Sequence, residues 1–152
     1  MQTPPGPIND NSAVILTCDI KGGNPLATVT WTCEGSSPIN PTGSPPTNTA
    51  TSSVQLTVNR NDNGIMCTCI GNHTVWTTDK TTGHTLDVRY QPTTLPTITQ
   101  TPVGPIIEGS KVTLTCTIQG GNPVATITWS CDGATQITPT GSPSTVDAIS
   151  SV

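Results

Sequence analysis

The chain repeats itself with a period of 98 residues, and this repeat limits its folds more than any other feature. When residues 1–54 are set above residues 99–152, no gap is needed and 33 of the 54 positions are identical. The stretch "GGNPLATVTWTCEG" meets "GGNPVATITWSCDG", for example. A repeat of this length has the size of one small domain. The sequence therefore holds one nearly whole unit and about half of a second.

The second copy stops partway through its unit. A half unit cannot bury its own hydrophobic face, so we expect the chain to be a fragment of a longer tandem array. A fragment would also lack a secretion signal, and the start "MQTPPGPIND" has neither its basic region nor its apolar core. The predicted organisation is a first domain over 1–91 with a first strand that could be truncated. A short proline-containing linker follows over 92–98, and residues 99–152 form a second domain that lacks its last two strands.

Composition indicates an all-β chain and excludes several classes of function. The 15 prolines and 14 glycines interrupt the chain too often for long helices, while frequent threonine suits half-buried strands. Charged residues make up 9% and the net charge is −4, so no basic patch is available for nucleic acid. No apolar run approaches the roughly 18 residues of a membrane helix. Six cysteines in so weakly charged a chain favour an oxidising compartment outside the cell.

Alternating hydrophobic residues mark the strands of the first copy. Strands are predicted at 13–20, 27–35, 52–60, 65–72 and 84–90. In the fourth of them, Cys67 and Cys69 lie two residues apart, so both side chains point to one face. The first copy has four cysteines, which allow three pairings. A four-thiolate zinc site is disfavoured because Cys-x-Cys is too short for a zinc knuckle, and redox catalysis is disfavoured because no Cys-x-x-Cys is present.

The spacing of these residues resembles the immunoglobulin superfamily. Cys18 is followed by Trp31 and then by "DNGIMCTC" before a final strand, which is similar to the pattern of that family. The resemblance covers essentially the whole chain and implies an immunoglobulin-like Greek-key β-sandwich. The spacing of 51 residues from Cys18 to Cys69 leaves no room for the extra hairpin of variable domains. The chain is thus similar to C2- or I-type domains of adhesion ectodomains such as nephrin, nectin and hemicentin.

The resemblance also implies how the cysteines pair. In the family a disulfide joins the two sheets and a tryptophan packs on it, which implies a Cys18–Cys69 bridge beside Trp31. The family's tyrosine two residues before the second cysteine is replaced here by Cys67. Because the two strands concerned run antiparallel in one sheet of the family, Cys33 would lie beside Cys67. The resemblance therefore implies a second bridge, Cys33–Cys67, between neighbouring strands.

The second copy repeats Cys116, Trp129 and Cys131. The expected partners of the two cysteines lie beyond residue 152, so Cys116 and Cys131 are predicted to be unpaired, with Trp129 as the core tryptophan. A bond between these two cysteines is disfavoured because their strands belong to different sheets of the family's sandwich.

A few other side chains are candidates for function. Asn72 heads the sequon "NHT" and is predicted to be glycosylated, the alternative being an unused sequon in a turn. Trp76 lies in a loop predicted over 73–82 and would either anchor a partner or fold back on the sheet. His73 and His84 have no third ligand, so they are predicted to be two solvated histidines. We expect no metal, no cofactor and no catalytic group.

The sequence predicts a non-enzymatic, extracellular protein-binding module within a tandem array that serves adhesion or cell-surface recognition. Its partners would be other proteins, in homophilic or heterophilic contacts, with no nucleic acid and no membrane segment in this stretch. The alternatives are spacer domains of a matrix protein and a secreted immune-recognition molecule. The short linker also predicts that the loop of Trp76 lies near the following copy and is partly shielded by it.

Overall fold

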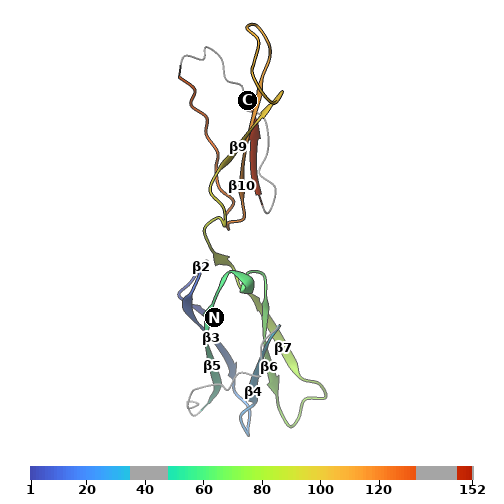
Figure 1. The fold of residues 1–152 in the computed structure, drawn as a ribbon. Coiled ribbons are helices and arrows are strands. Elements are labelled where there is room, and N and C mark those ends of the chain that lie inside the picture. The colour runs from blue at the N-terminus through green and yellow to red at the C-terminus, as the bar shows by residue number, and fades with distance from the viewer. Residues whose placement is uncertain (35–47, 133–146, 152) are drawn as a thin grey trace. The chain divides into compact units, whose positions relative to one another are not determined.

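The computed structural model describes residues 1–34, 48–132 and 147–151. The chain divides into two compact units, Met1–Arg89 and Tyr90–Val152. The regular elements described are strands, apart from one 3-10 turn (Figure 1). The fold is therefore all-β, as the composition predicts. The sequence also predicts that the extra hairpin of variable domains is missing. Residues 35–47, where that hairpin would lie, are outside the described residues.

The first unit is a Greek-key sandwich of two three-stranded sheets. One sheet has the order β1-β3-β5, with β1 at Gln2–Thr3, β3 at Ser12–Lys21 and β5 at Thr49–Val58. The other has the order β4-β6-β7, with β4 at Thr28–Cys33, β6 at Met66–Asn72 and β7 at Lys80–Thr85. Within each of the two sheets, neighbouring strands run antiparallel.

The N-terminal segment contributes to both sides of the sandwich. Strand β1 pairs with β3, whereas β2 (Ile8–Asn9) pairs in parallel with β8 (Val88–Arg89). The residues between β1 and β2 are "PPGP", and prolines cannot donate to a ladder. The pairing with β3 therefore ends after Thr3, and the chain next pairs with β8 through β2.

The core lies on the faces that the alternation predicts. Val14, Leu16 and Val54 from one sheet and Val88 from β8 are at most 1% exposed. On β4 and β6 the buried positions alternate with exposed or half-buried ones, as expected for strands with one face in the core.

The last strand differs from the prediction of one element over 84–90. Strand β7 already begins at Lys80 and ends at Thr85, and β8 begins at Val88. Leu86 between them is still paired, because its N–H donates to the carbonyl of Ile65 at 2.9 Å and its carbonyl accepts from the N–H of Gly64 at 2.8 Å. The partner changes at the next hydrogen bond. The N–H of Val88 donates to the side chain of Asn63 at 2.9 Å, and the strand then continues beside β2 instead of β6.

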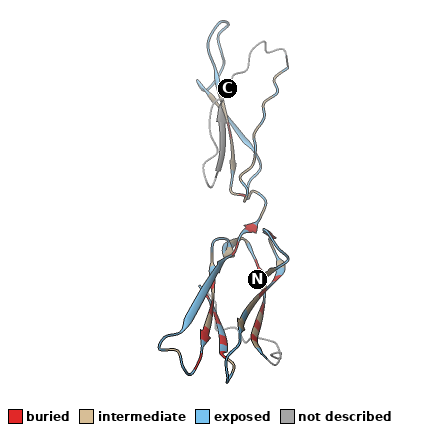
Figure 2. Ribbon diagram, turned by 180° about the vertical axis from the view of Figure 1, so that it is seen from behind, coloured by how far each residue is buried: buried red, intermediate tan, exposed pale blue. Residues whose placement is uncertain are grey.

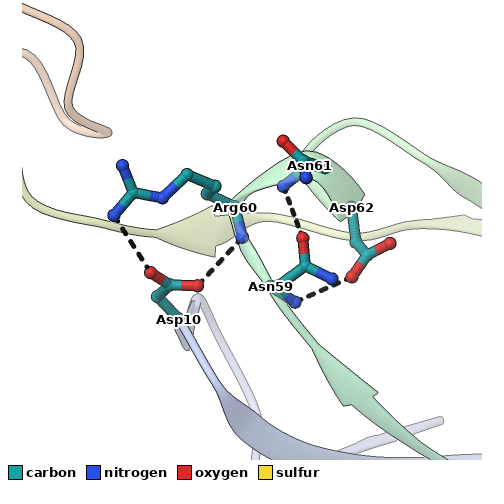
Figure 3. A network of polar contacts seen from close by, with 5 residues as sticks. All are labelled: Asp10, Asn59, Arg60, Asn61 and Asp62. Atoms are coloured by element: carbon teal, nitrogen blue, oxygen red, sulfur yellow. Dashed lines mark hydrogen bonds and ion pairs between the residues drawn. The ribbon is translucent and has the colours of Figure 1, made fainter. Parts of the chain in front are cut away.

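The turn between β5 and β6 is a short 3-10 element, Arg60–Asp62, and its polar groups satisfy one another (Figure 3). The Asn59 side chain accepts from the N–H of Asn61 at 2.9 Å, and Asp62 accepts from the N–H of Asn59 at 2.7 Å. Asp10 accepts from the backbone N–H of Arg60 at 2.9 Å and from its guanidinium at 3.3 Å. This reciprocal capping satisfies the backbone N–H groups at the start of the turn.

The described part of the second unit forms a single sheet. Strands β9 (Thr97–Thr101), β10 (Thr113–Gln119) and β11 (Asp147–Ser151) have the order β11-β10-β9. The residues equivalent to β4, 126–131, are described and form no strand. Cys116 is the one buried hydrophobic residue among those described in this unit, whereas buried side chains line the sandwich of the first (Figure 2). A single sheet has no opposing layer to bury its inner face.

The residues between the copies belong to the second unit. Tyr90 and Asn122 exchange two backbone hydrogen bonds of 3.0 and 2.9 Å, and the N–H of Thr93 donates to the carbonyl of Gln119 at 2.9 Å. Strand β9 then begins at Thr97. The segment predicted as a linker is thus hydrogen-bonded to the turn and strand that follow it in the sequence.

Candidate binding face and the disulfides beneath it

Two disulfides hold the first unit. Cys18 on β3 is bonded to Cys69 on β6, with an S–S distance of 1.99 Å and a Cα–Cα distance of 6.4 Å, so this bridge joins the two sheets. Cys33 on β4 is bonded to Cys67 on β6, with an S–S distance of 1.98 Å and a Cα–Cα distance of 4.0 Å. The four cysteines of the first copy are therefore all paired in the structure.

The second bridge is possible because of the ladder pattern between β4 and β6. Cys33 lies directly opposite Cys67. The next pair along is hydrogen-bonded, since the N–H of Glu34 donates to the carbonyl of Met66 at 3.1 Å. Because hydrogen-bonded and non-hydrogen-bonded pairs alternate, Cys33 and Cys67 form a non-hydrogen-bonded pair, the kind whose Cα atoms approach to about 4.5 Å. The register thus brings the two cysteines close enough to bond.

Trp31 spans the space between the sheets beside the first bridge. It lies opposite Cys69 on the ladder and is 5% exposed. Its indole N–H donates to the hydroxyl of Ser52 on the opposing sheet at 3.1 Å. Ser52 itself faces Cys18 on β3 and is 4% exposed. Sequence reasoning missed Ser52, although a serine at an inward position of an alternating strand is a signal for such a partner.

In the second unit Cys116 and Cys131 carry free thiols. Cys116 is buried and Cys131 is half-buried. Trp129 is also half-buried, which is consistent with the single sheet described there.

The outer face of the β4-β6-β7 sheet is uncharged and rich in threonine, and we refer to it as the threonine face. It consists of Thr28, Thr30 and Thr32 on β4, Met66, Thr68, Ile70 and Asn72 on β6, and Thr81, Gly83 and Thr85 on β7. The register aligns these residues in rows across the three strands. Met66 is 43% exposed and Ile70 is half-buried. The face offers hydroxyl and apolar groups to a partner.

Carboxylates stand at the two ends of the threonine face. Glu34 follows β4 directly and is exposed. At the other end the side-chain amide of Asn72 donates to the carboxylate of Asp79 at 2.6 Å, and both residues are exposed. The sequon asparagine is therefore accessible and lies at the edge of the threonine face.

The prediction of a solvated His73 is wrong. Its side chain is 9% exposed, its Nε2 atom lies 2.7 Å from the carbonyl of Pro25, and Nδ1 accepts from the N–H of Val75 at 3.3 Å. These partners require Nε2 to carry the proton, because a carbonyl can only accept. A methyl group on Gly23 would meet His73 Nε2 at 2.9 Å, so the turn before β4 needs a glycine there. The contact depends on the fold, and the local sequence gives no sign of it.

Trp76 folds back against the unit. Its ring lies 5.5 Å from the ring of His73 at an angle of 45°, and a side chain on Gly71 would contact it at 3.5 Å. Because β7 begins at Lys80, the loop covers 73–79 and is shorter than predicted. Val75, which is 76% exposed, is the apolar side chain that this loop presents to solvent.

The loop of Trp76 also lies at the end of the first unit away from Arg89, through which the chain leaves that unit. Strand β6 runs from the turn at Arg60–Asp62 to the loop, and β7 returns from the loop toward β8. The strand order explains this placement, because a hairpin loop and the end of its returning strand lie at opposite ends of a sheet.

His84 is exposed, and its Nε2 atom is hydrogen-bonded to the side chain of Gln2. Across the described ranges, no three acidic, histidine or cysteine side chains gather in the manner of a metal site. In the same ranges, no helix has the length and apolar character needed to cross a membrane.

Comparisons with known proteins agree with this geometry. A model described as "Immunoglobulin domain" matches residues 4–85, and a second one with the same description matches residues 96–151. V-set and immunoglobulin domain-containing protein 10 of Danio rerio is 29% identical over 120 residues, which is 78% of this chain and 21% of that protein. Nephrin of Homo sapiens is 29% identical over 128 residues, which is 82% of this chain and 10% of that protein. The chain thus spans about a fifth of the length of the first relative and a tenth of the length of the second.

A solved structure shows the same fold. The crystal structure of the full ectodomain (Ig1–Ig3) of mouse nectin-like molecule 4 superposes with a TM-score of 0.58 at 24% identity. The match covers 81% of this chain and 43% of the other. At this level of identity the likeness concerns the fold alone.

Proposed function

Because this chain belongs to the immunoglobulin domain family, we propose that it is a non-enzymatic, extracellular protein-binding module and that its partner docks on the threonine face. A fold alone does not decide a function, so the proposal depends on a particular surface. Two disulfides in a unit this small support the extracellular setting, because they suit an oxidising compartment.

The observation that carries the proposal is the lack of charge across the threonine face. Docking a partner removes water from the surface, and an unpaired charge would make this costly. The central parts of protein interfaces are accordingly depleted of charged residues. Here Thr30, Ile70 and Thr81 form one row across the sheet, so hydroxyl groups flank an aliphatic side chain. Such a row can bury apolar surface while the hydroxyls exchange hydrogen bonds with the partner.

The rim of the threonine face contributes in a different way. Glu34 and Asp79 at its ends favour a partner with basic side chains at the matching positions. We further propose that Asn72 is glycosylated and that a glycan there limits access from one end. The loop beside it would add contacts through Val75.

The experiment compares two matched variants of the whole chain. Thr30→Arg places a charge in the middle of the threonine face, and Gln55→Arg places the same charge on the exposed face of β5 in the other sheet. Beads coated with the chain report homophilic contacts by aggregation, and a panel of cell-surface ectodomains reports heterophilic ones. We expect Thr30→Arg to weaken the observed binding at least tenfold and Gln55→Arg to leave it unchanged. Equal binding by both variants would show that the partner docks elsewhere, and a lack of binding by the unchanged chain in both assays would favour a spacer role instead.

Glycosylation is tested separately. The chain secreted from mammalian cells should lose mass on enzymatic removal of N-linked glycans, and Asn72→Gln should abolish that loss. A secreted chain with no N-linked mass would show that the sequon is unused.

A further inference from the structure

We propose that His73 is a pH-sensitive switch, which holds the loop 73–79 against the turn 22–25 while its imidazole is neutral and releases the loop when the imidazole gains a proton. The loop joins β6 to β7. The proposal goes beyond the proposed function, and its test needs no binding partner.

The imidazole ring of His73 attaches the loop to a distant part of the unit. Its Nε2–H group donates to the carbonyl of Pro25 at 2.7 Å. The turn leaves room for the ring because position 23 is a glycine, where a methyl group would lie 2.9 Å from Nε2. Among the described residues, no other hydrogen bond joins a side chain of 73–79 to a residue outside the β6-β7 hairpin. The position of the loop therefore depends on this ring.

The same ring also organises the loop itself. Its Nδ1 atom accepts from the N–H of Val75 at 3.3 Å, and the N–H of Trp76 donates to the carbonyl of His73 at 2.9 Å. The indole ring of Trp76 then lies 5.5 Å from the imidazole ring and beside Gly71 on β6, where it is half-buried. Both nitrogens of His73 are thus engaged, one as a donor and one as an acceptor.

Protonation of the ring is incompatible with these contacts. An imidazolium donates from both nitrogens, so Nε2 keeps its bond to Pro25. The new N–H group at Nδ1, however, would point at the N–H of Val75, and neither group can accept. The ring is also 9% exposed, and a buried charge is costly unless it is paired. The protonated ring is therefore satisfied only after it leaves this site and reaches water.

The surroundings of His73 offer little to compensate a positive charge. The segments that contact it are the turn and its own loop, and their side chains are uncharged over 22–25 and 74–78. The charged residues that flank them, Lys21, Asp79 and Lys80, are all exposed, and Asp79 already accepts from the side-chain amide of Asn72 at 2.6 Å. The ring face of Trp76 can attract a cation, but it cannot replace the acceptor that the N–H of Val75 loses.

The direction of the response follows from these contacts. The docked loop holds the neutral ring, so binding of a proton favours the released loop, and docking is lost as the pH falls. Imidazole changes its charge between about pH 5 and pH 8, so the response falls in this range. Release would expose the indole of Trp76.

His84 is not expected to respond in the same way, because it is exposed and its contact tolerates a proton. Its Nε2 atom is bonded to the side-chain oxygen of Gln2. The amide nitrogen of Gln2 donates to the carbonyls of Pro4 and Gly6, so the oxygen remains the acceptor for His84 in either charge state.

The test follows the whole chain by NMR from about pH 8 to about pH 5. A cross-peak between ring protons of Trp76 and α-protons of Gly71 reports the docked loop, and the ring carbon shifts of His73 report its protonation. We expect the cross-peak to disappear by about pH 5, with the same midpoint as the titration of His73. Slow amide exchange at Cys69 throughout shows that the sandwich is intact.

Two results would overturn the proposal. One is a cross-peak that survives after the ring of His73 has titrated. The other is a ring of His73 that takes up no proton by about pH 5 in an intact sandwich.

Three variants identify the group that titrates. His73→Gln keeps a donor for the carbonyl of Pro25 but cannot titrate, so any cross-peak that it retains should be independent of pH. Asp79→Asn keeps an acceptor for the amide of Asn72, and His84→Gln removes the other histidine. Both of these should respond to pH as the unchanged chain does. Loss of the cross-peak on acidification in His73→Gln, or no response in either of the other two, would show that another group controls the loop.

Discussion

Removal of the Cys33–Cys67 bridge should weaken the first unit without unfolding it, whereas removal of the Cys18–Cys69 bridge should be more damaging. The variants are Cys33→Ala with Cys67→Val, and Cys18→Ala with Cys69→Val. Both remove one covalent link and keep an apolar side chain in its place. The comparison is useful because the inner loop of 34 residues lies within the outer loop of 51.

The magnitudes follow from the entropy of the unfolded chain. Closing the inner loop alone contributes about 3.8 kcal/mol, and the outer bridge then closes a further loop of about 17 residues for about 3.1 kcal/mol. The outer bridge alone contributes about 4.1 kcal/mol. Loss of the inner bridge therefore costs about 3 kcal/mol, and loss of the outer bridge costs about the same through chain entropy.

The two variants differ in how much stabilising contact they remove from the folded structure. Cys33 and Cys67 lie on strands that the β4-β6 ladder already joins. Cys18 and Cys69 are the covalent link between the two sheets, and Trp31 lies beside it. Trp31 is 5% exposed and would lose part of its packing with this bridge, which adds about 1–2 kcal/mol. We therefore expect a loss of about 3 kcal/mol for the inner bridge and about 4–5 kcal/mol for the outer one.

Urea unfolding of the whole chain, followed by fluorescence and circular dichroism, measures both losses. With an m-value of about 1.5 kcal/mol/M, the loss of the inner bridge lowers the midpoint by about 2 M. Thiol titration under denaturing conditions should find only the two thiols of Cys116 and Cys131 in each variant, which shows that the remaining bridge has formed. If the inner variant were unfolded without urea, or less stable than the outer variant, the reasoning would be refuted.

Three further predictions follow from single contacts or from the division into units. Ser52→Ala leaves the buried indole N–H of Trp31 without its partner, so the unfolding free energy should fall by about 1–3 kcal/mol, and an unchanged urea midpoint would contradict this. Asp62→Ala removes the acceptor for the N–H of Asn59 and should cost about 0.5–2 kcal/mol by the same assay, while leaving both disulfides intact by peptide mapping. Residues 90–152 expressed alone should show no cooperative thermal transition, because their described strands form one sheet with almost no buried side chains; a sharp calorimetric peak would show otherwise.

The sequence alone determined the class of fold and the faces that its main strands bury. Alternation with a period of two is a local property, so the buried faces of β3, β4 and β6 could be assigned from residue type. The family resemblance implied which cysteines meet, and the structure bonds Cys18 to Cys69 and Cys33 to Cys67. These inferences needed only a period, a spacing and a known pattern.

Contacts between residues far apart in sequence were decided by the tertiary structure. His73 is buried because the loop of β6 and β7 returns over the turn at Pro25, which lies 48 residues earlier. Trp76 folds against that histidine, and the loop stands away from Arg89 because of the strand order. Periodicity reports which face of a strand is buried, but it carries no information on what lies across from that face or beside its edge.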